Sequence, residues 1–172
     1  MADWGRVRLR AVEPADIDEL YDIENDMELW NVGAANTPFS RHSIEQYVMS
    51  AGDIYSDKQA RWMVEDSSGA VVGVADLANF SPRHSRAEVG IVIKKAHRGR
   101  GYAKQAVGRL AFYASESLCI RQLYAVVDKA NQPAMALFRS AGFKETAVLD
   151  DWLSTPAGFS PVALFQLIFR RQ

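Results

Sequence analysis

The feature that most restricts how this chain can fold is the segment Arg98-Gly99-Arg100-Gly101-Tyr102-Ala103, which joins two patterns of different period. Residues 87–93 form a β-branched run that predicts a strand, whereas residues 102–118 place apolar side chains on one helical face. The two glycines allow the backbone N–H groups to turn inward, and the start of a helix carries a partial positive charge that favours an anion. Together with Lys104 the segment adds three full positive charges. It therefore predicts a phosphate-binding turn between a strand and a helix.

Two common nucleotide-binding patterns fit this segment poorly. No Gly-Lys-Ser/Thr follows four residues after a glycine, as a Walker loop requires, and Lys104 stands where a dinucleotide-binding turn has its third glycine. A basic turn that binds no ligand is the alternative that the residues alone leave open. Binding of nucleic acid through this segment is disfavoured, because the whole chain has 20 Lys and Arg against 21 Asp and Glu.

The remaining patterns predict one mixed α/β domain that spans residues 1–172, with no internal repeat and no linker. The expected order is β-α-α-β-β-β-α-β-α-β-β. Strands are predicted at residues 7–12, 61–65, 71–80, 87–93, 122–127, 143–153 and 162–169, with a loop at 154–161 before the last. Helices are predicted after Glu13-Pro14, after Ser40 as N-cap, over 102–118, and from the N-cap Asn131 to residue 141.

Composition and charge exclude several classes of protein. The chain has 48% apolar residues and a formal net charge of -1, which excludes collagen-like and disordered chains. Its one cysteine, Cys119, cannot form an internal disulfide and is expected to be a buried core thiol, as suits a reducing compartment. The first ten residues lack the apolar core of a signal peptide, and no apolar run is long enough to span a membrane. We therefore expect a cytoplasmic protein that binds neither a membrane nor a metal ion.

The small net charge conceals two regions of opposite sign. Residues 83–109 hold eight Lys and Arg against one acid, Glu88, whereas residues 11–40 hold eight acids and no base. The basic region suits a polyphosphate ligand and the acidic region suits a cationic one. The acids of an early helix can equally form a solvated face, since they also favour the helix dipole.

Three segments resemble the GNAT family of N-acetyltransferases. The family signature Arg/Gln-x-x-Gly-x-Gly/Ala is met by Arg98, Gly101 and Ala103. The block 131–143, Asn-Gln-Pro-Ala-Met-Ala-Leu-Phe-Arg-Ser-Ala-Gly-Phe, and the opening 9–16, Leu-Arg-Ala-Val-Glu-Pro-Ala-Asp, are similar to two further parts of that family. Residues 122–129 and 85–88 look like spermidine acetyltransferases, and ribosomal-protein N-terminal acetyltransferases share the same layout. The resemblance implies a twisted, mixed and largely antiparallel sheet of about seven strands and about four helices, with a V-shaped splay between strands 87–94 and 122–127.

The resemblance also implies acetyl-CoA as co-substrate, bound in that splay. The backbone of Ile91, Val92 and Ile93 is then expected to pair with the pantetheine amides, and Asn131 to donate to the pantetheine arm. Ala134 and Phe138 are expected to line the CoA side, although Asn131 can also be only a helix cap and Phe138 only a core residue. The pyrophosphate is expected on Arg98, Gly99, Arg100, Gly101, Tyr102, Ala103 and Lys104.

Amine acetylation needs a base, and Glu88 is the carboxylate that the resemblance places beside the acetyl group. Glu88 can alternatively pair with Arg86 or Arg83, or face solvent at the start of a strand. Many family members have a tyrosine at the position of Phe138, where it protonates the leaving thiolate. Phe138 has no proton to give, so Tyr102 and Tyr124 are considered as substitutes.

The acceptor is expected to bind among the first helices and their joining loop, with Glu28, Trp30 and Asn31 as candidate contacts. The function predicted is the transfer of an acetyl group to the primary amine of a polyamine or of a peptide N-terminus, by direct attack in a ternary complex. A catalytically weak acyl-CoA-binding or regulatory module is the alternative, because of Phe138. The apolar last strand, 162–169, could pair two chains into a homodimer.

Overall fold

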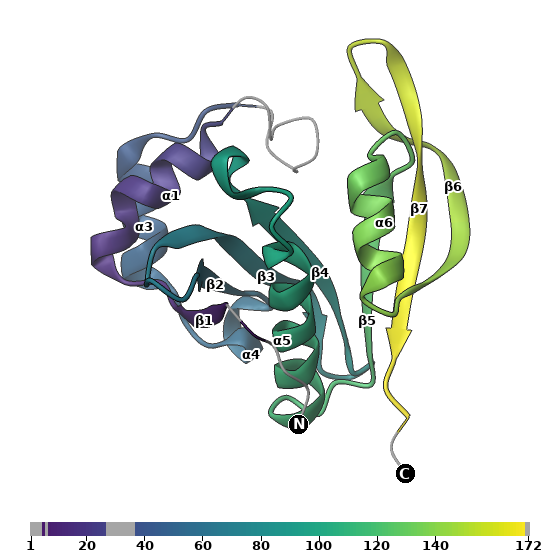
Figure 1. Ribbon diagram of the computed structural model, residues 1–172, viewed down its shortest axis with the longest axis horizontal. Coiled ribbons are helices and arrows are strands. Elements are labelled where there is room, and N and C mark those ends of the chain that lie inside the picture. Colours follow the sequence, from purple (N-terminus) through teal and green to yellow (C-terminus); the bar gives the residue numbers. More distant parts are fainter. Residues whose placement is uncertain (1–4, 6, 27–36, 171–172) are drawn as a thin grey trace.

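One seven-stranded sheet in the order β1-β2-β3-β4-β5-β7-β6 organises the molecule (Figure 1). The computed structural model describes residue 5, residues 7–26 and residues 37–170. The strands are β1 (Arg8–Ala11), β2 (Ala60–Glu65), β3 (Val71–Ser81), β4 (Arg86–Ile93), β5 (Gln122–Asp128), β6 (Lys144–Thr155) and β7 (Gly158–Ile168). In the described part of the sheet, β4 and β5 are parallel and the other neighbours are antiparallel. The sheet is open, and the expected mixed α/β fold is confirmed.

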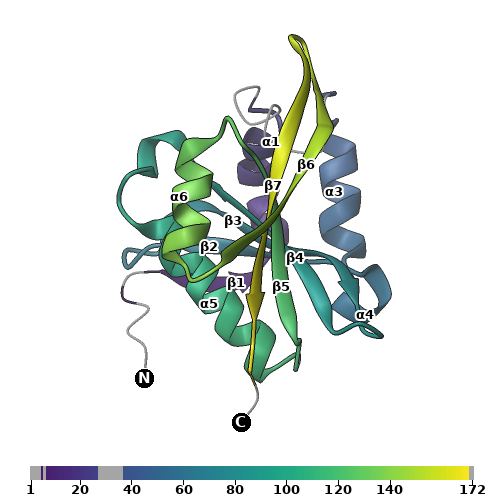
Figure 2. The same cartoon turned by 90° about the vertical axis from the view of Figure 1, so that its right-hand side faces the viewer.

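Helices cover both faces of this sheet. They are α1 (Ile17–Glu24), α3 (Arg41–Ser50), α4 (Ile54–Asp57), α5 (Tyr102–Glu116) and α6 (Gln132–Ser140), with 3₁₀ turns η1 (Pro14–Asp16) and η2 (Lys95–His97). Figure 2 shows α5 and α6 on one side and α1 and α3 on the other. Each side has its own apolar core: Leu110 and Phe138 belong to the α5 and α6 side, and Leu20 and Ile44 pack with Met63 on the opposite face.

Side chains that accept hydrogen bonds from backbone N–H groups explain where three of the helices begin. Ser40 Oγ accepts a hydrogen bond from Ser43 N at 3.0 Å, and Asn131 Oδ1 accepts one from Ala134 N at 3.1 Å, so both predicted N-caps are confirmed. Helix α4 was not predicted from the sequence. Asp53 caps it by accepting from the backbone of Tyr55 and Ser56, but one turn is too short to show a helical period.

The predicted splay lies between β4 and β5. These strands pair only over Arg86–Glu88 and Gln122–Tyr124, after which β4 stays with β3 and β5 stays with β7. Figure 1 shows the two halves of the sheet diverging from this junction. The backbone of β4 from Val89 to Ile93 therefore lacks a strand partner on its β5 side.

The C-terminal part of the sheet corrects two sequence-based expectations. Residues 154–161 are not a loop, because β6 and β7 continue through them to a tight turn at Pro156 and Ala157. Strand β7 lies between β5 and β6, so it cannot pair two chains as an edge strand, as was expected of residues 162–169. Five α-helices occur among the described residues where about four were expected, the short α4 being the addition.

Cys119 was expected in the core and is instead exposed. It has a left-handed backbone, with φ of 53°, in the turn between α5 and β5. The next residue, Ile120, takes the buried position, being only 2% exposed. The thiol lies outside the core because Cys119 falls within the turn, while its neighbour Ile120 occupies the core position.

Candidate active site

The basic glycine segment forms a turn whose concave surface is open. Gly99 and Gly101 have φ values of 74° and 81°, a left-handed conformation that costs most other residues free energy. A Cβ built on Gly99 would meet no atom within 4 Å, and one on Gly101 would meet only the end of the Gln105 side chain at 3.7 Å. Gly101 is the N-cap of α5, so the unpaired N–H groups of the first helical turn lie at this opening. The predicted strand-turn-helix is confirmed, and its shape suits a phosphate group.

Each charged side chain of this turn is exposed. Arg98, Arg100 and Lys104 all reach solvent, and Arg98 also donates from Nε to the carbonyl of Ile93 at 3.0 Å. That hydrogen bond fastens the turn to the end of β4. Tyr102 and Ala103 are half-buried at the start of α5. The positive charges thus surround the helix N-terminus without an acidic side chain within the segment.

The other residues expected to contact acetyl-CoA lie on both sides of the splay. Ile91 and Val92 are half-buried on β4, and Ile93 is buried. Across the opening, Asn131 caps α6 and Ala134 is half-buried on the same helix. The strand, the turn and α6 thus flank the splay between β4 and β5, and the binding of acetyl-CoA by these residues stays a prediction.

Phe138 is a core residue. It is 4% exposed and its ring contacts those of Phe143 and Phe165, at centroid distances of 5.2 and 6.0 Å. It has no hydroxyl and its ring is enclosed by two others. A proton for a leaving group must therefore come from elsewhere.

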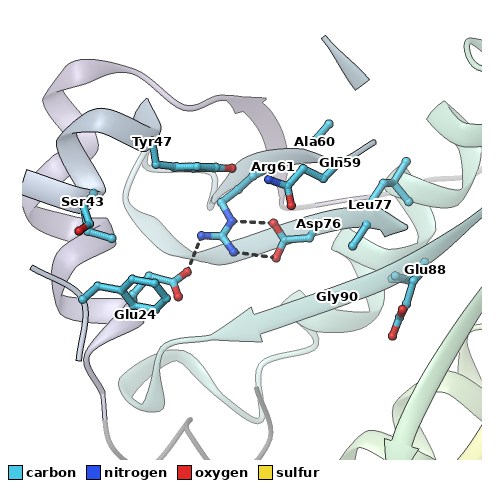
Figure 3. Close-up of a pocket in the computed structure, with 14 residues that line it drawn as sticks. Glu24, Ser43, Tyr47, Gln59, Ala60, Arg61, Asp76, Leu77, Glu88 and Gly90 are labelled. Atoms are coloured by element: carbon cyan, nitrogen blue, oxygen red, sulfur yellow. Dashed lines mark hydrogen bonds and ion pairs between the residues drawn. The ribbon is translucent and has the colours of Figure 1, made fainter. Parts of the chain in front are cut away.

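On the α1 and α3 face, a pocket of about 380 Å³ lies over β2, β3 and β4 (Figure 3). Glu88 and Gly90 form its β4 wall, and Tyr47 of α3 closes the opposite side. Its charged lining consists of Glu24, Arg61, Asp76 and Glu88. Three carboxylates against one guanidinium give the pocket an acidic balance, which favours a cation.

Arg61 is held at the base of this pocket by two carboxylates. Its guanidinium donates to Asp76 at 2.6 Å and to Glu24, and its Cζ lies 5.6 Å from the centre of the Tyr47 ring. Figure 3 shows the guanidinium between the two acids. Burial alone would lower the pKa of Arg61, but the carboxylate of Asp76 and then that of Glu24 raise it above its usual value. Burial also raises the pKa of Tyr47.

Glu88 stands apart from that network and is bound by a neutral group. Asn79 Nδ2 donates to Glu88 Oε2 at 2.7 Å, rather than Arg83 or Arg86 pairing with it as the sequence left open. Tyr124 is opposite Glu88 in the parallel β4–β5 pair. Burial raises the pKa of Tyr124, and the carboxylate of Glu88 raises it further. Glu88 thus lies at the pocket wall and at the junction where the two strands separate.

Ion pairs engage at least four of the eight acids in residues 11–40. Asp16 pairs with Arg10 at 2.6 Å and Glu19 with Lys94 at 2.5 Å, and Asp18 and Glu24 pair with arginines. Of the acids in its described residues only Glu24 lines the pocket. Glu24 is thus the acid of this region that the described residues place at the pocket, and the candidates Glu28, Trp30 and Asn31 lie outside the described residues.

Sequence reasoning missed Tyr47, Arg61, Asp76 and Asn79. Arg61 and Asp76 face each other because β2 and β3 pair in that register, and Asn79 reaches Glu88 because β3 bulges between Ala78 and Ser81. Both contacts follow from the register of the strands. The alternation of polar and apolar residues in the sequence does not specify that register to the single residue. The polar pairs carried no signal in the sequence by themselves.

No group of three or more His, Cys, Asp or Glu side chains in the part of the chain that the structure describes could hold a metal ion. The helices in that part of the chain include none with the length and apolar character needed to cross a membrane.

An open α/β sheet that splays beside a basic glycine turn, with a carboxylate at the junction, combines an anion site with a candidate base, as expected of the class of enzymes that transfer a group from a phosphate-bearing co-substrate. Comparison with known proteins narrows this class. The model of the GNAT acetyltransferase domain matches residues 6–144. The chain therefore belongs to the GNAT acetyltransferase family, and it is an acetyl-CoA-dependent N-acetyltransferase that acts on a primary amine.

Several relatives share a more specific name. Spermidine N(1)-acetyltransferase of Vibrio cholerae is 25% identical over 140 residues, which cover 81% of this chain and 80% of the relative. The enzyme of the same name from Escherichia coli K12 is 27% identical over 141 residues, covering 80% and 72% of the two chains. A crystal structure of the Vibrio cholerae spermidine N-acetyltransferase, in complex with CoA and spermine, superposes with a TM-score of 0.86 at 23% identity, covering 94% of this chain and 95% of that one. This last likeness shows that the fold is shared.

Proposed function

We propose that this N-acetyltransferase acetylates a polyamine such as spermidine, and that the pocket under α3 receives the cationic acceptor. The observation that carries this proposal is the acidic balance of the pocket together with the position of Glu88 on its wall. Each additional ammonium group of a polyamine gains from that field, whereas a neutral chain of equal length does not. The names of the two relatives support the same substrate class.

The proposed acetyl-CoA site is the splay and the glycine turn. Gly99 to Lys104 would hold the pyrophosphate with backbone N–H groups and positive charges, and Arg98 keeps the turn attached to β4. The backbone of Ile91, Val92 and Ile93 would bind the pantetheine arm, with Asn131 and Ala134 on the opposite side. The thioester would then lie near the junction of β4 and β5, beside Glu88.

Glu88 is the proposed general base. An alkylamine with a pKa of about 10.4 is neutral in only about one molecule in 2,500 at pH 7, which corresponds to about 4.6 kcal/mol of lost reactivity. A carboxylate that first attracts the ammonium and then accepts its proton offsets part of this. Asn79 suits that role, because a neutral donor orients the carboxylate without cancelling its charge.

Release of free CoA thiol tests the activity and the base together. The wild-type protein should release CoA from acetyl-CoA in the presence of spermidine, and Glu88→Gln should lower kcat about 100-fold without weakening CoA binding. Glu116→Gln, which removes an exposed carboxylate of α5, is the matched control and should keep wild-type kcat. Unchanged kcat in Glu88→Gln from pH 6 to pH 9 would exclude Glu88 as the base.

An acceptor panel separates the two kinds of amine that the sequence left open. Spermidine, spermine, butylamine and a peptide with a basic N-terminus present the same nucleophile with different charge and bulk. We expect a higher kcat/KM for the two polyamines than for butylamine, with the difference shrinking as salt screens the pocket. A preference for the peptide would transfer the proposal to N-terminal acetylation. CoA binding without turnover on any amine would instead favour the weak CoA-binding module.

Cytoplasmic location, homodimer formation and the absence of nucleic-acid and membrane partners stay predictions. The polyamine proposal depends on none of them.

A further inference from the structure

Glu88 and Tyr124 form the last residue pair before β4 and β5 separate. Residues opposite each other in neighbouring strands project to the same face of the sheet. The carboxylate and the phenol are thus adjacent at the closed end of the splay, where the proposed function places the thioester. Tyr124 is half-buried there.

Asn79 holds this pair in place from the neighbouring strand. The β3–β4 register is interrupted between Ala78 and Ser81, and Asn79 within the interruption has a left-handed φ of 49°. Asparagine is among the few residues that adopt this conformation readily. The bulge directs its amide to Glu88, with the 2.7 Å hydrogen bond described above. A neutral amide thereby leaves the carboxylate its charge and fixes one of its two oxygens.

The reaction requires a proton at the sulfur, and Phe138 cannot supply it. We propose that Tyr124 donates this proton and that Glu88 returns it, so that one proton removed from the amine ends on the thiol of CoA. The proposal rests on the base role of Glu88 stated above. Tyr124 of β5 thus takes the role of proton donor to the sulfur, for which α6 offers only the buried Phe138.

The atoms balance without a further reactant. The ammonium first loses one proton to solvent through Glu88, and the nitrogen then forms a bond to the thioester carbonyl carbon. As the carbon–sulfur bond breaks, the nitrogen gives its second proton to Glu88 and the Tyr124 hydroxyl gives its proton to the sulfur. The phenolate regains a proton from the carboxyl group of Glu88. The products are an amide, a thiol and one proton in solution.

The acidities explain why the two residues must act together. A free thiol has a pKa of about 8.5 and a free phenol about 10, so a tyrosine alone is a weaker acid than the thiol that it would protonate. Its surroundings raise the pKa of Tyr124 still further, which keeps it protonated at neutral pH. A carboxylic acid is stronger than both, so refilling the phenol from Glu88 makes the overall transfer to sulfur favourable.

The test begins with Tyr124→Phe, which removes one hydroxyl and keeps the ring. We expect kcat for spermidine to fall about 30-fold, with KM for acetyl-CoA changed less than twofold. Tyr113→Phe is the matched control, since it removes a tyrosine hydroxyl from an exposed position of α5 outside the proposed sites, and it should keep wild-type kcat. Retention of more than half the wild-type kcat by Tyr124→Phe overturns the proposal, provided that Glu88→Gln is impaired in the same assay.

A second measurement decides the matter if Tyr124→Phe folds poorly. A fluorinated tyrosine at position 124 keeps the shape and lowers the phenol pKa. If Tyr124 is the proton donor, fluorination should move the alkaline limb of the pH profile of kcat to lower pH. An unmoved limb contradicts the proposal. Failure of the wild type to turn over, or full activity of Glu88→Gln, would instead refute the proposed function, so the two failures are distinct.

Discussion

At the scale of single residues, the pocket under α3 depends on a cation that the sequence did not single out. Arg61 lies between Glu24 and Asp76, with each of these three side chains only about one-fifth exposed. Removing the guanidinium leaves two partly buried carboxylates without a counter-charge. We expect Arg61→Met to lose about 3 kcal/mol of unfolding free energy in urea at pH 7. The control Arg41→Met breaks an exposed pair with Asp18, and it should leave the midpoint unchanged.

A second residue-scale prediction concerns pH. Hydrogen bonds from Arg10 lower the pKa of Asp16, against the opposing effect of burial. A carboxyl whose folded pKa is lowered stabilises the fold above its unfolded pKa of about 3.9, and this contribution disappears as the pH falls through the folded value. Asp16→Asn should therefore lose about 2 kcal/mol at pH 7 and progressively less below pH 4, as measured by urea unfolding. An equal loss at pH 7 and pH 3 would refute this linkage.

At the scale of elements, the glycine turn was predictable because its conformation is dictated locally. Gly101 needs a left-handed backbone before α5, and that requirement is visible in six consecutive residues. Gly101→Ala should cost about 1 kcal/mol in stability and raise KM for acetyl-CoA about tenfold, because the strained turn relaxes away from the phosphate. Gly69→Ala is the control, since Gly69 has a similar φ of 83° in the β2–β3 turn. It should lose similar stability and keep the wild-type KM; a KM raised equally in both variants would contradict a specific role for the turn.

The features that the sequence did not predict at the scale of elements depend on contacts between strands. The pairing of Arg61 with Asp76 and of Asn79 with Glu88 follows from register and from one bulge. Glu88 was proposed because the resemblance placed it beside the acetyl group, whereas its hydrogen-bond partner Asn79 was not predicted. Helix α4 and the tight β6–β7 turn were missed because each is too short to show a repeating pattern in the sequence.

At the scale of the whole molecule, the order of elements was predictable and the outer surface was not. The β6–β7 hairpin projects beyond the rest of the sheet (Figures 1 and 2), with β6 as the edge strand. Trp152 and Phe159 are 56% and 68% exposed near its tip. Large exposed aromatic side chains on an edge hairpin favour association between chains, since exposed backbone and apolar area are both available there. The expected homodimer would thus use β6 and the hairpin tip rather than the last strand.

We therefore expect the 19.2 kDa chain to sediment as an oligomer at about 50 μM and to dissociate on dilution, because mass action governs assembly. Combining Trp152→Ser with Phe159→Ser should shift the sedimenting species to the monomer mass without changing the unfolding midpoint of the monomer, since both side chains are exposed. Phe112→Ser removes an equally exposed aromatic ring, 58% accessible, from the outer face of α5 and serves as the control. If Phe112→Ser dissociates the oligomer as completely as the hairpin variant, association depends on general surface hydrophobicity and not on the hairpin. If the wild type sediments as a monomer at every concentration, the predicted association through the hairpin is wrong.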